Sequence, residues 1–236
     1  MSPPEDSARR SLFDRIRQNL AATQPDAVRR EAVARRLAEH PRSLIPARAS
    51  VHGPALVQLF AGFIEGQGGT VLQVPMPAET PSAIARYLRS NNLPARIRMG
   101  ADPYLAAMPW DTEPALERRL GRAAPDDAVG LTHALAGVAE TGTLVVASGA
   151  DNPVTLSFLP ETNIVVLQQA NMVGSYEAAW DRLRATFGPG KLPRTVNFIS
   201  GPSRTADIGG VLVRGAHGPK RLCVVLVGSA STTSQT

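Results

Sequence analysis

The feature that most constrains the fold is a series of short, strongly apolar runs in the second half of the chain. Five of them read AVGLTH, GTLVVAS, NIVVLQ, TVNFIS and LCVVLV. Uninterrupted apolar runs of this length are typical of strands that are buried on both faces, as in a parallel sheet. We therefore expect these five runs to be central strands of a largely parallel sheet.

Helix-like segments alternate with strand-like ones from residue 53 onward. GPALVQLFAGFIEGQGG reads as a helix, TVLQV as a strand, TPSAIARYLRSNN as a helix capped by Thr80 with Pro81 in its first turn, and ARIRMG as another strand. A further helix is predicted from Ser175 to Phe187. Such alternation predicts βα units and an α/β fold.

Two amphipathic helices are predicted near the N-terminus, because apolar residues recur at helical spacing within residues 7–20 and again within residues 25–39. Pro41 and Pro46 then break the helical pattern and mark a linker. We expect three regions: a helical arm and linker over 1–50, an α/β domain over 51–228, and a frayed tail over 229–236.

Most of the net charge of +5 comes from arginine, since Lys191 and Lys220 are the only lysines. Arginines are concentrated in the two predicted N-terminal helices, at Arg9, Arg10, Arg15, Arg17, Arg29, Arg30, Arg35 and Arg36. Acidic residues are interspersed with them, at Asp14, Asp26, Glu31 and Glu39. This interleaving is typical of a solvated helix face, and a surface that docks on an acidic partner is the alternative. Nucleic-acid binding is the weakest interpretation.

The chain has no run of 18 uninterrupted apolar residues, and its first 20 residues lack the apolar core of an export signal. We therefore expect no membrane span and a cytoplasmic location. The single cysteine, Cys223, excludes an intrachain disulfide and any zinc or iron-sulfur site built from four cysteines of this chain. The histidines at 40, 52, 133 and 217 show no close metal-ligand spacing, so we expect no metal site.

Glu140 is a candidate catalytic residue, because it precedes Thr141, Gly142 and Thr143 directly before a predicted buried strand. A carboxylate held against a glycine turn can act as a general base or as a nucleophile, since the glycine lets a substrate approach the backbone and burial raises a carboxyl pKa. The alternative is a structural turn in which Glu140 faces solvent or is satisfied by neighbouring backbone amides.

The stretch ISGPSRTADI predicts an anion-binding loop. A turn that begins at Gly201 brings the amides and hydroxyls of Ser203 and Thr205 toward one point, which suits an anion. The Arg204 guanidinium can grip a carboxylate or phosphate with two parallel hydrogen bonds. Asp207 would orient that guanidinium or cap the next turn; a structural ion pair between the two is the alternative.

A second loop, before the last predicted strand, contains His217 and Lys220. Both side chains would lie near the first loop if the strands beside the two loops are neighbours. Ligands of open α/β sheets collect at the carboxyl ends of the strands, so we expect a small anionic ligand at that edge. The common nucleotide, zinc-protease and serine-hydrolase motifs are absent.

Three segments, AETGTLVV, ISGPSRTADI and GAHGPKRLCVVLV, resemble in this order the LUD domain of the lactate utilization protein C family, also called LutC or YkgG. The resemblance is strong over 129–227 and looser from residue 51. It implies a three-layer α/β/α sandwich with a largely parallel sheet, similar to the sugar-phosphate isomerase and CoA-transferase class (NagB/RpiA/CoA transferase-like). Many members carry a small residue and an acid where this chain has His133, Ala134 and Leu135.

The resemblance also implies a function in the oxidation of L-lactate to pyruvate. It places this chain in a multi-subunit complex as the subunit without iron-sulfur clusters, with the clusters in partner subunits. The alternative is an enzyme or sensor of the isomerase and CoA-transferase-like class that binds a small carboxylate, a phosphate or a CoA ester. The residues leave open whether this chain is itself catalytic.

Overall fold

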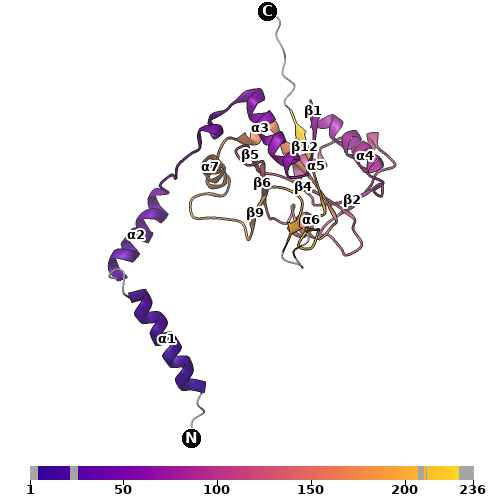
Figure 1. Ribbon diagram of the computed structural model, residues 1–236. Coiled ribbons are helices and arrows are strands. Elements are labelled where there is room, and N and C mark those ends of the chain that lie inside the picture. Colours follow the sequence, from indigo (N-terminus) through magenta and orange to yellow (C-terminus); the bar gives the residue numbers. More distant parts are fainter. Residues whose placement is uncertain (1–4, 22–25, 207–209, 211, 229–236) are drawn as a thin grey trace, which may run out of the picture. The chain divides into compact units, whose positions relative to one another are not determined.

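A computed structural model describes residues 5–21, 26–206, 210 and 212–228 (Figure 1). The chain divides into two units, Met1–Leu44 and Ile45–Thr236. The expected tail over 229–236 lies outside the described residues. In the part of the chain that is described, no helix has the length and apolar character needed to cross a membrane.

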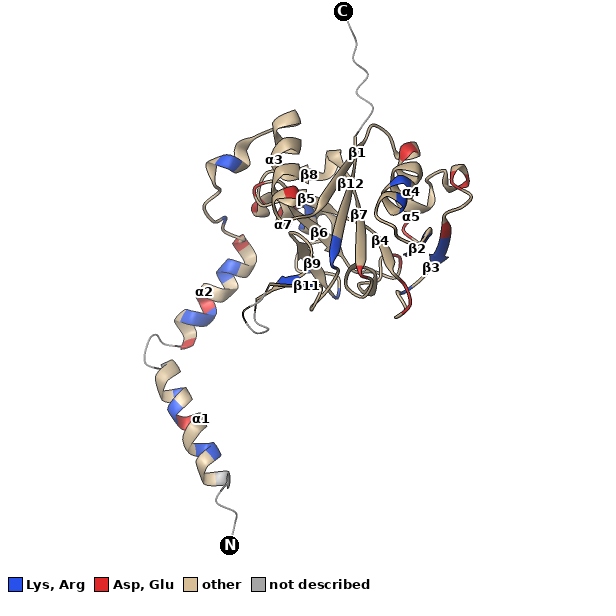
Figure 2. Cartoon of the chain, turned by 45° about the vertical axis from the view of Figure 1, so that its right-hand side comes forward, with Lys and Arg blue, Asp and Glu red and all other residues tan. Residues whose placement is uncertain are grey.

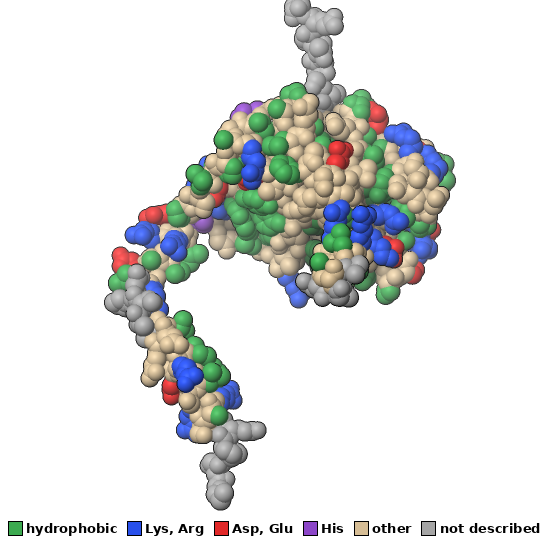
Figure 3. Space-filling model, in the orientation of Figure 1, with side chains coloured by type: hydrophobic (Ala, Val, Ile, Leu, Met, Phe, Trp, Pro, Cys, Tyr) green, Lys and Arg blue, Asp and Glu red, His purple; other side chains and the backbone are tan. Residues whose placement is uncertain are grey.

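The first unit contains α1 (Glu5–Ala21) and α2 (Asp26–Glu39), which confirms the two predicted N-terminal helices. Basic and acidic residues alternate along both helices (Figure 2). Apolar side chains lie along one side of α1 (Figure 3), and Leu12 and Leu20 are 58% and 60% exposed. These apolar side chains therefore remain accessible in the chain as described.

A six-stranded parallel sheet is the centre of the second unit (Figure 2). Its strands, in spatial order, are β1 (Thr70–Val74), β12 (Arg221–Val227), β7 (Thr162–Gln168), β4 (Val129–His133), β2 (Arg96–Met99) and β3 (Glu117–Leu120). Every neighbouring pair is parallel. The predicted α/β fold with a largely parallel sheet is confirmed, and three of the five apolar runs form β4, β7 and β12 in its interior.

Both faces of this sheet are covered, which explains why its central strands are apolar throughout. Odd-numbered residues from Cys223 to Val227 pack in a core with α4 (Thr80–Ser90) and α5 (Pro103–Ala106). Even-numbered residues from Leu222 to Leu226 pack in a second core with α3 (Gly53–Gly66). Figure 1 shows α4 and α3 on opposite sides of β12.

A second, four-stranded sheet was not predicted. Its order is β8 (Met172–Val173), β5 (Ala136–Val138), β6 (Thr143–Ala147) and β9 (Val196–Ile199), and α7 (Tyr176–Phe187) packs on it. The apolar runs GTLVVAS and TVNFIS form β6 and β9, so their assignment to the parallel sheet was wrong. β6 is antiparallel to both neighbours, and its short connection from β5 allows only a hairpin between those two strands.

The remaining elements are short. They are the two-stranded antiparallel ribbon β10 (Arg204–Thr205) and β11 (Val213–Arg214), the helix α6 (Thr155–Phe158), and the 3-10 turns η1 (Ala47–Ser50), η2 (Pro77–Glu79), η3 (Trp110–Thr112) and η4 (Gln169–Asn171).

The helix starts differ in how well the sequence predicted them. Ser175 caps α7, because its Oγ accepts a hydrogen bond from the Ala178 amide at 3.3 Å. The predicted cap of α4 was wrong: Glu79 occupies the N-cap position without a side-chain hydrogen bond, and Thr80 is already helical. The Thr80 hydroxyl is buried and has no hydrogen-bond partner among the described residues.

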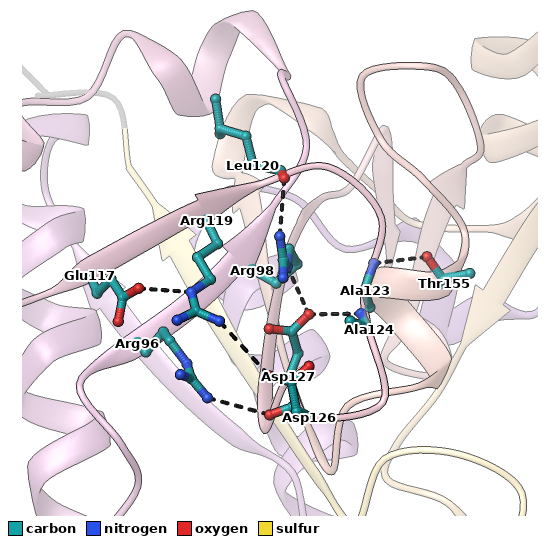
Figure 4. A network of polar contacts seen from close by, with 10 residues as sticks. All are labelled: Arg96, Arg98, Glu117, Arg119, Leu120, Ala123, Ala124, Asp126, Asp127 and Thr155. Carbon is teal, nitrogen blue, oxygen red and sulfur yellow. Dashed lines mark hydrogen bonds and ion pairs between the residues drawn. The ribbon is translucent and has the colours of Figure 1, made fainter.

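A polar network fixes the amino end of β4 (Figure 4). The Asp127 carboxylate accepts hydrogen bonds from Arg98 Nε and from the Ala124 amide, both at 2.7 Å. Burial opposes the ionised carboxylate, but these hydrogen bonds outweigh it and lower the pKa of Asp127. The network joins the start of β4 to its neighbour β2.

The helix α6 lies directly against the amino end of β4. The Ala123 amide donates to Thr155 Oγ1 at 3.1 Å, which ties α6 to the loop before the strand (Figure 4). A methyl group on Gly130 of β4 would lie 2.2 Å from the Leu156 carbonyl oxygen. Only glycine therefore lets α6 approach this closely, and the approach places Ser157 at the amino edge of the sheet.

Candidate functional site

A cavity of about 250 Å³ lies at the amino ends of two central strands. Asn163 and Leu222, the second residues of β7 and β12, contribute to its lining. The loop after β9, the loop before β12 and the helix α6 complete it. The two loops were expected at the carboxyl ends of the parallel strands; they lie at the amino ends instead, because β9 does not belong to the parallel sheet.

The two predicted loops meet at this cavity. The Ser203 amide donates to the Pro219 carbonyl at 2.8 Å, and the His217 amide donates to Ser203 Oγ at 3.2 Å. The strands beside the two loops, β9 and β12, belong to different sheets. The loops therefore meet through these hydrogen bonds, and not because their strands are neighbours. The Ser203 amide is also occupied, so it does not serve as the anion donor that we expected; its hydroxyl proton remains available.

Two arginines stand opposite each other beside the cavity. Arg204 of β10 pairs in register with Arg214 of β11, so both side chains project from the same face of the ribbon. Neither forms an ion pair with any described residue, and like charges placed directly opposite destabilise a β-ribbon. Figure 3 shows Lys and Arg side chains gathered on one face of this unit. The arrangement favours an anion, which would relieve the repulsion.

Two cavity-lining polar groups are buried without a partner. Asn163 is 1% exposed; its Oδ1 accepts a hydrogen bond from Thr132 Oγ1 at 3.3 Å, whereas its Nδ2 has no partner among the described residues. The Ser157 hydroxyl also has no hydrogen-bond partner among the described residues, and Ser157 is likewise 1% exposed. Buried polar groups are nearly always hydrogen-bonded, so these two are among the exceptions in the described part of the chain.

A cluster of hydroxyls connects the ETGT segment to the cavity wall. Thr143 Oγ1 lies 2.6 Å from Ser200 Oγ, 2.7 Å from Thr141 Oγ1 and 2.9 Å from the Tyr176 hydroxyl. The Tyr176 hydroxyl is also 2.9 Å from Thr141 Oγ1. Ser200 lines the cavity, so this cluster fixes the chain just before the Gly201 turn.

Glu140 caps a helix in this structure. It is 5% exposed, and its Oε1 accepts a hydrogen bond from the Tyr176 amide at 3.0 Å, at the first residue of α7. A carboxylate at a helix N-terminus satisfies a free amide and interacts favourably with the helix dipole. The backbone carbonyl oxygen of Glu140 accepts a hydrogen bond from Arg48 Nε of η1 at 3.1 Å. Glu140 does not line the cavity.

The predicted site residues therefore fall into three groups. Those that line the cavity are Gly201, Ser203, Arg204 and His217, and those outside its lining are Glu140, Thr141, Gly142, Thr143, Thr205 and Lys220. Asp207 lies outside the described residues. Lys220 Nζ contacts Glu161 Oε1 at 2.7 Å instead of facing the cavity.

Gly142 is needed for packing. Its φ of +61° is in the left-handed region, and a Cβ there would lie 2.6 Å from the Phe63 side chain of α3.

Sequence reasoning missed Ser157 and Asn163. Ser157 stands in a short segment with no recognisable motif. Asn163 did carry a signal, since it is a polar residue inside the run TNIVVLQ, which is otherwise typical of a strand buried on both faces.

A second polar cluster lies at the carboxyl ends of the parallel strands. His133, the last residue of β4, places Nδ1 3.1 Å from Asp102 Oδ2, and its ring stacks on Tyr104 with centroids 4.7 Å apart. Burial opposes ionisation of Asp102, but hydrogen bonds from His133 and the Leu105 amide outweigh it and lower the pKa of Asp102. His133 Nε2 is buried without a partner among the described residues.

Nothing in the described residues brings three His, Cys, Asp or Glu side chains together as metal ligands. Cys223 is fully buried in β12, and burial raises the pKa of its thiol. A buried thiol of this kind is unreactive.

Comparison with known proteins assigns the core to a described family. The model of the LUD domain matches residues 61–227. A protein of Shouchella clausii called lactate utilization protein C is 36% identical over 118 residues, which are 50% of this chain and 51% of that protein. The protein of the same name from Bacillus subtilis is 34% identical over 119 residues, covering 50% of this chain and 49% of that protein. The chain thus spans about half the length of these two relatives.

Two proteins of Deinococcus radiodurans match over longer stretches. One, also called lactate utilization protein C, is 33% identical over 161 residues, which are 64% of this chain and 70% of that protein. The other is the crystal structure of a DUF162 family protein, with a TM-score of 0.55 and 22% sequence identity. That match covers 78% of this chain and 100% of the solved chain, and it supports the fold.

Proposed function

Because the chain belongs to the LUD domain family, we propose that it takes part in L-lactate utilization and that its cavity beside Arg204 binds a small carboxylate. The observation that carries the ligand proposal is Arg204, which lines the cavity and stands opposite Arg214 without an ion pair to any described residue. Lactate and pyruvate are carboxylates small enough for a cavity of about 250 Å³.

Calorimetric titration of the full chain with L-lactate, pyruvate, a sugar phosphate and a CoA ester tests the binding. We expect saturable binding of lactate or pyruvate that Arg204→Ala weakens by about tenfold or more, since a charged hydrogen bond is lost. Arg89→Ala, which removes an exposed arginine of α4, is the matched control and should bind normally. The carboxylate proposal fails if the wild type binds none of these ligands.

The subunit arrangement is part of the same proposal. This chain would act in a complex that oxidises L-lactate to pyruvate in the cytoplasm, with the iron-sulfur clusters in partner subunits. The exposed apolar side of α1 and the arginines of α1 and α2 support docking of residues 1–44 on a partner.

A pull-down tests the docking. Full-length chain should retain cluster-bearing partners, whereas a variant that starts at Ile45 should lose them while still binding lactate or pyruvate. Equal retention by both forms would remove the docking role of the two helices. Deletion of the gene should abolish growth on L-lactate in a host without another lactate oxidase.

The opposing pair Arg204 and Arg214 supports a second candidate, an enzyme or sensor whose ligand carries a phosphate. The same titration separates the two. A sugar phosphate or CoA ester that binds much more tightly than lactate and pyruvate would favour this candidate. Nucleic-acid binding would instead appear as salt-sensitive retention of DNA or RNA by the full chain.

A further inference from the structure

The Arg204 guanidinium lies against the turn that joins α3 to β1. A Cβ placed on Gly68 of this turn would lie 2.2 Å from Arg204 Nη2 and 3.4 Å from Arg204 Cζ. Arg204 is nevertheless an exposed residue, so a ligand can reach it. The guanidinium therefore occupies the space that a side chain at position 68 would need.

The same turn contacts the cavity lining on both sides of Gly68. A Cβ on Gly201 would lie 3.1 Å from Gln67 Cβ, and a Cβ on Gly69 would lie 3.5 Å from the Leu222 carbonyl oxygen. Gly201 and Leu222 both line the cavity. Residues 67–69 therefore pack against the cavity lining, with Gly68 between the two contacts.

This turn is fixed by hydrogen bonds to the ETGT segment and to α3. Gln67 Nε2 donates to the Thr141 carbonyl oxygen at 3.3 Å. The Gly68 amide donates to the Glu65 carbonyl oxygen at 2.7 Å, where α3 ends, and Gly68 has a φ of +81°. The dipole of α3 also favours a cation such as Arg204 at this end of the helix.

The ribbon of β10 and β11 does not by itself hold the guanidinium in place. Arg204 forms no ion pair with any described residue, and Arg214, which stands opposite it in register, has the same charge. Like charges placed opposite each other repel. The contact with Gly68 is therefore the one that sets where the guanidinium lies in the described part of the chain.

We propose that Gly68 is a positioning residue for the carboxylate site, because the absence of a side chain there lets the Arg204 guanidinium lie at the edge of the cavity. This inference rests on the proposed carboxylate site at Arg204. Apart from the two chain neighbours, a methyl group on Gly68 would meet only Arg204 within 4 Å among the described residues. The long Arg204 side chain can move away without disturbing the fold, but its hydrogen bonds to a carboxylate depend on geometry.

Calorimetric titration of the full chain with pyruvate and L-lactate tests this role. We expect Gly68→Ala to weaken the binding of either acid by about threefold to tenfold, because a displaced guanidinium loses its hydrogen-bond geometry. Gly190→Ala is the matched control, since Gly190 has a φ of +70° and a Cβ there meets no described atom within 4 Å. It imposes the same kind of backbone strain and should bind like the wild type.

A double variant shows whether Gly68 acts through Arg204. In the Arg204→Ala background the methyl group has no guanidinium to displace, so adding Gly68→Ala should leave the remaining affinity unchanged. Urea denaturation should show a similar loss of stability in Gly68→Ala and Gly190→Ala, because both carry backbone strain. If Gly68→Ala does not fold, Gly68→Asn places a Cβ at the same point with less strain, and Gly190→Asn is its control.

Wild-type affinity in Gly68→Ala, together with weakened binding by Arg204→Ala, would overturn the role of Gly68 and leave the carboxylate site intact. An equal loss from Gly68→Ala with and without Arg204 would overturn it in the same way. Absence of binding of both acids by the wild type would instead overturn the carboxylate site itself, and the role of Gly68 with it.

Discussion

At the scale of single residues, Glu140 holds the start of α7 and does not line the cavity. Arg204 and His217 do line a cavity, but the Glu140 carboxylate accepts a hydrogen bond from the first amide of α7. Residue type and a neighbouring glycine cannot distinguish a catalytic base from a helix-capping residue, because both roles need a carboxylate near unpaired hydrogen-bond donors. Only the position of Tyr176, 36 residues further on, separates them.

The capping role predicts a graded loss of stability. Glu140→Ala should lower the free energy of unfolding by about 1 to 2 kcal/mol, since it removes the acceptor at the start of α7. Glu140→Gln keeps an acceptor and should lose less. Urea denaturation measures both. If Glu140 were instead a catalytic base, Glu140→Gln would unfold like the wild type and yet fail to support growth on L-lactate.

At the scale of elements, apolar runs predicted strands well but not their sheets. GTLVVAS forms a buried strand as expected and TVNFIS a half-buried one, yet they are β6 and β9 of the antiparallel part of the second sheet. Apolar patterning reports burial on both faces and carries no information on the pairing partner. The cavity could not be placed from the sequence for the same reason. Its position at the amino ends of β7 and β12 depends on the sheet to which β9 belongs, and apolar patterning does not report that sheet.

The contact between α6 and β4 predicts that Gly130 is essential for the position of α6. Gly130→Ala places a methyl group against the Leu156 carbonyl, so α6 must move. We expect a loss of about 1 to 3 kcal/mol in unfolding free energy, together with weaker pyruvate binding. Gly149→Ala is the control, because a Cβ there meets only one atom, at 3.9 Å. Full stability and affinity in Gly130→Ala would contradict this role of α6.

The link between Arg98 and Asp127 predicts a pH-dependent contribution to stability. Because the pKa of Asp127 is lowered in the folded chain, its contribution is present above the usual carboxyl pKa near 4 and is lost as the pH falls through the folded value. Asp127→Ala should lower the unfolding free energy by about 3 to 5 kcal/mol at pH 7.

Denaturation at several pH values checks this, and the difference between Asp127→Ala and the wild type should shrink below about pH 4. The exposed Asp111 lies 3.9 Å from Arg118, and Asp111→Ala should change stability little at any pH. A difference for Asp127→Ala that stays constant down to pH 2 would show that ionisation of Asp127 does not stabilise the fold.

At the scale of the whole molecule, the parallel sheet carries polar clusters at both ends. The general rule for α/β sheets points to the carboxyl ends, where His133 and Asp102 pair. The cavity and the unpaired groups of Ser157 and Asn163 lie at the amino ends. The residue types of the two loops pointed to the cavity, whereas the expectation that these loops follow strands of the parallel sheet placed them at the opposite edge.

A crystal structure of the full chain with saturating pyruvate tests the central claim most directly. We predict pyruvate in the cavity, with its carboxylate on Arg204. Pyruvate bound beside His133 and Asp102, with the cavity empty, would contradict the claim and move the functional site to the other end of the sheet.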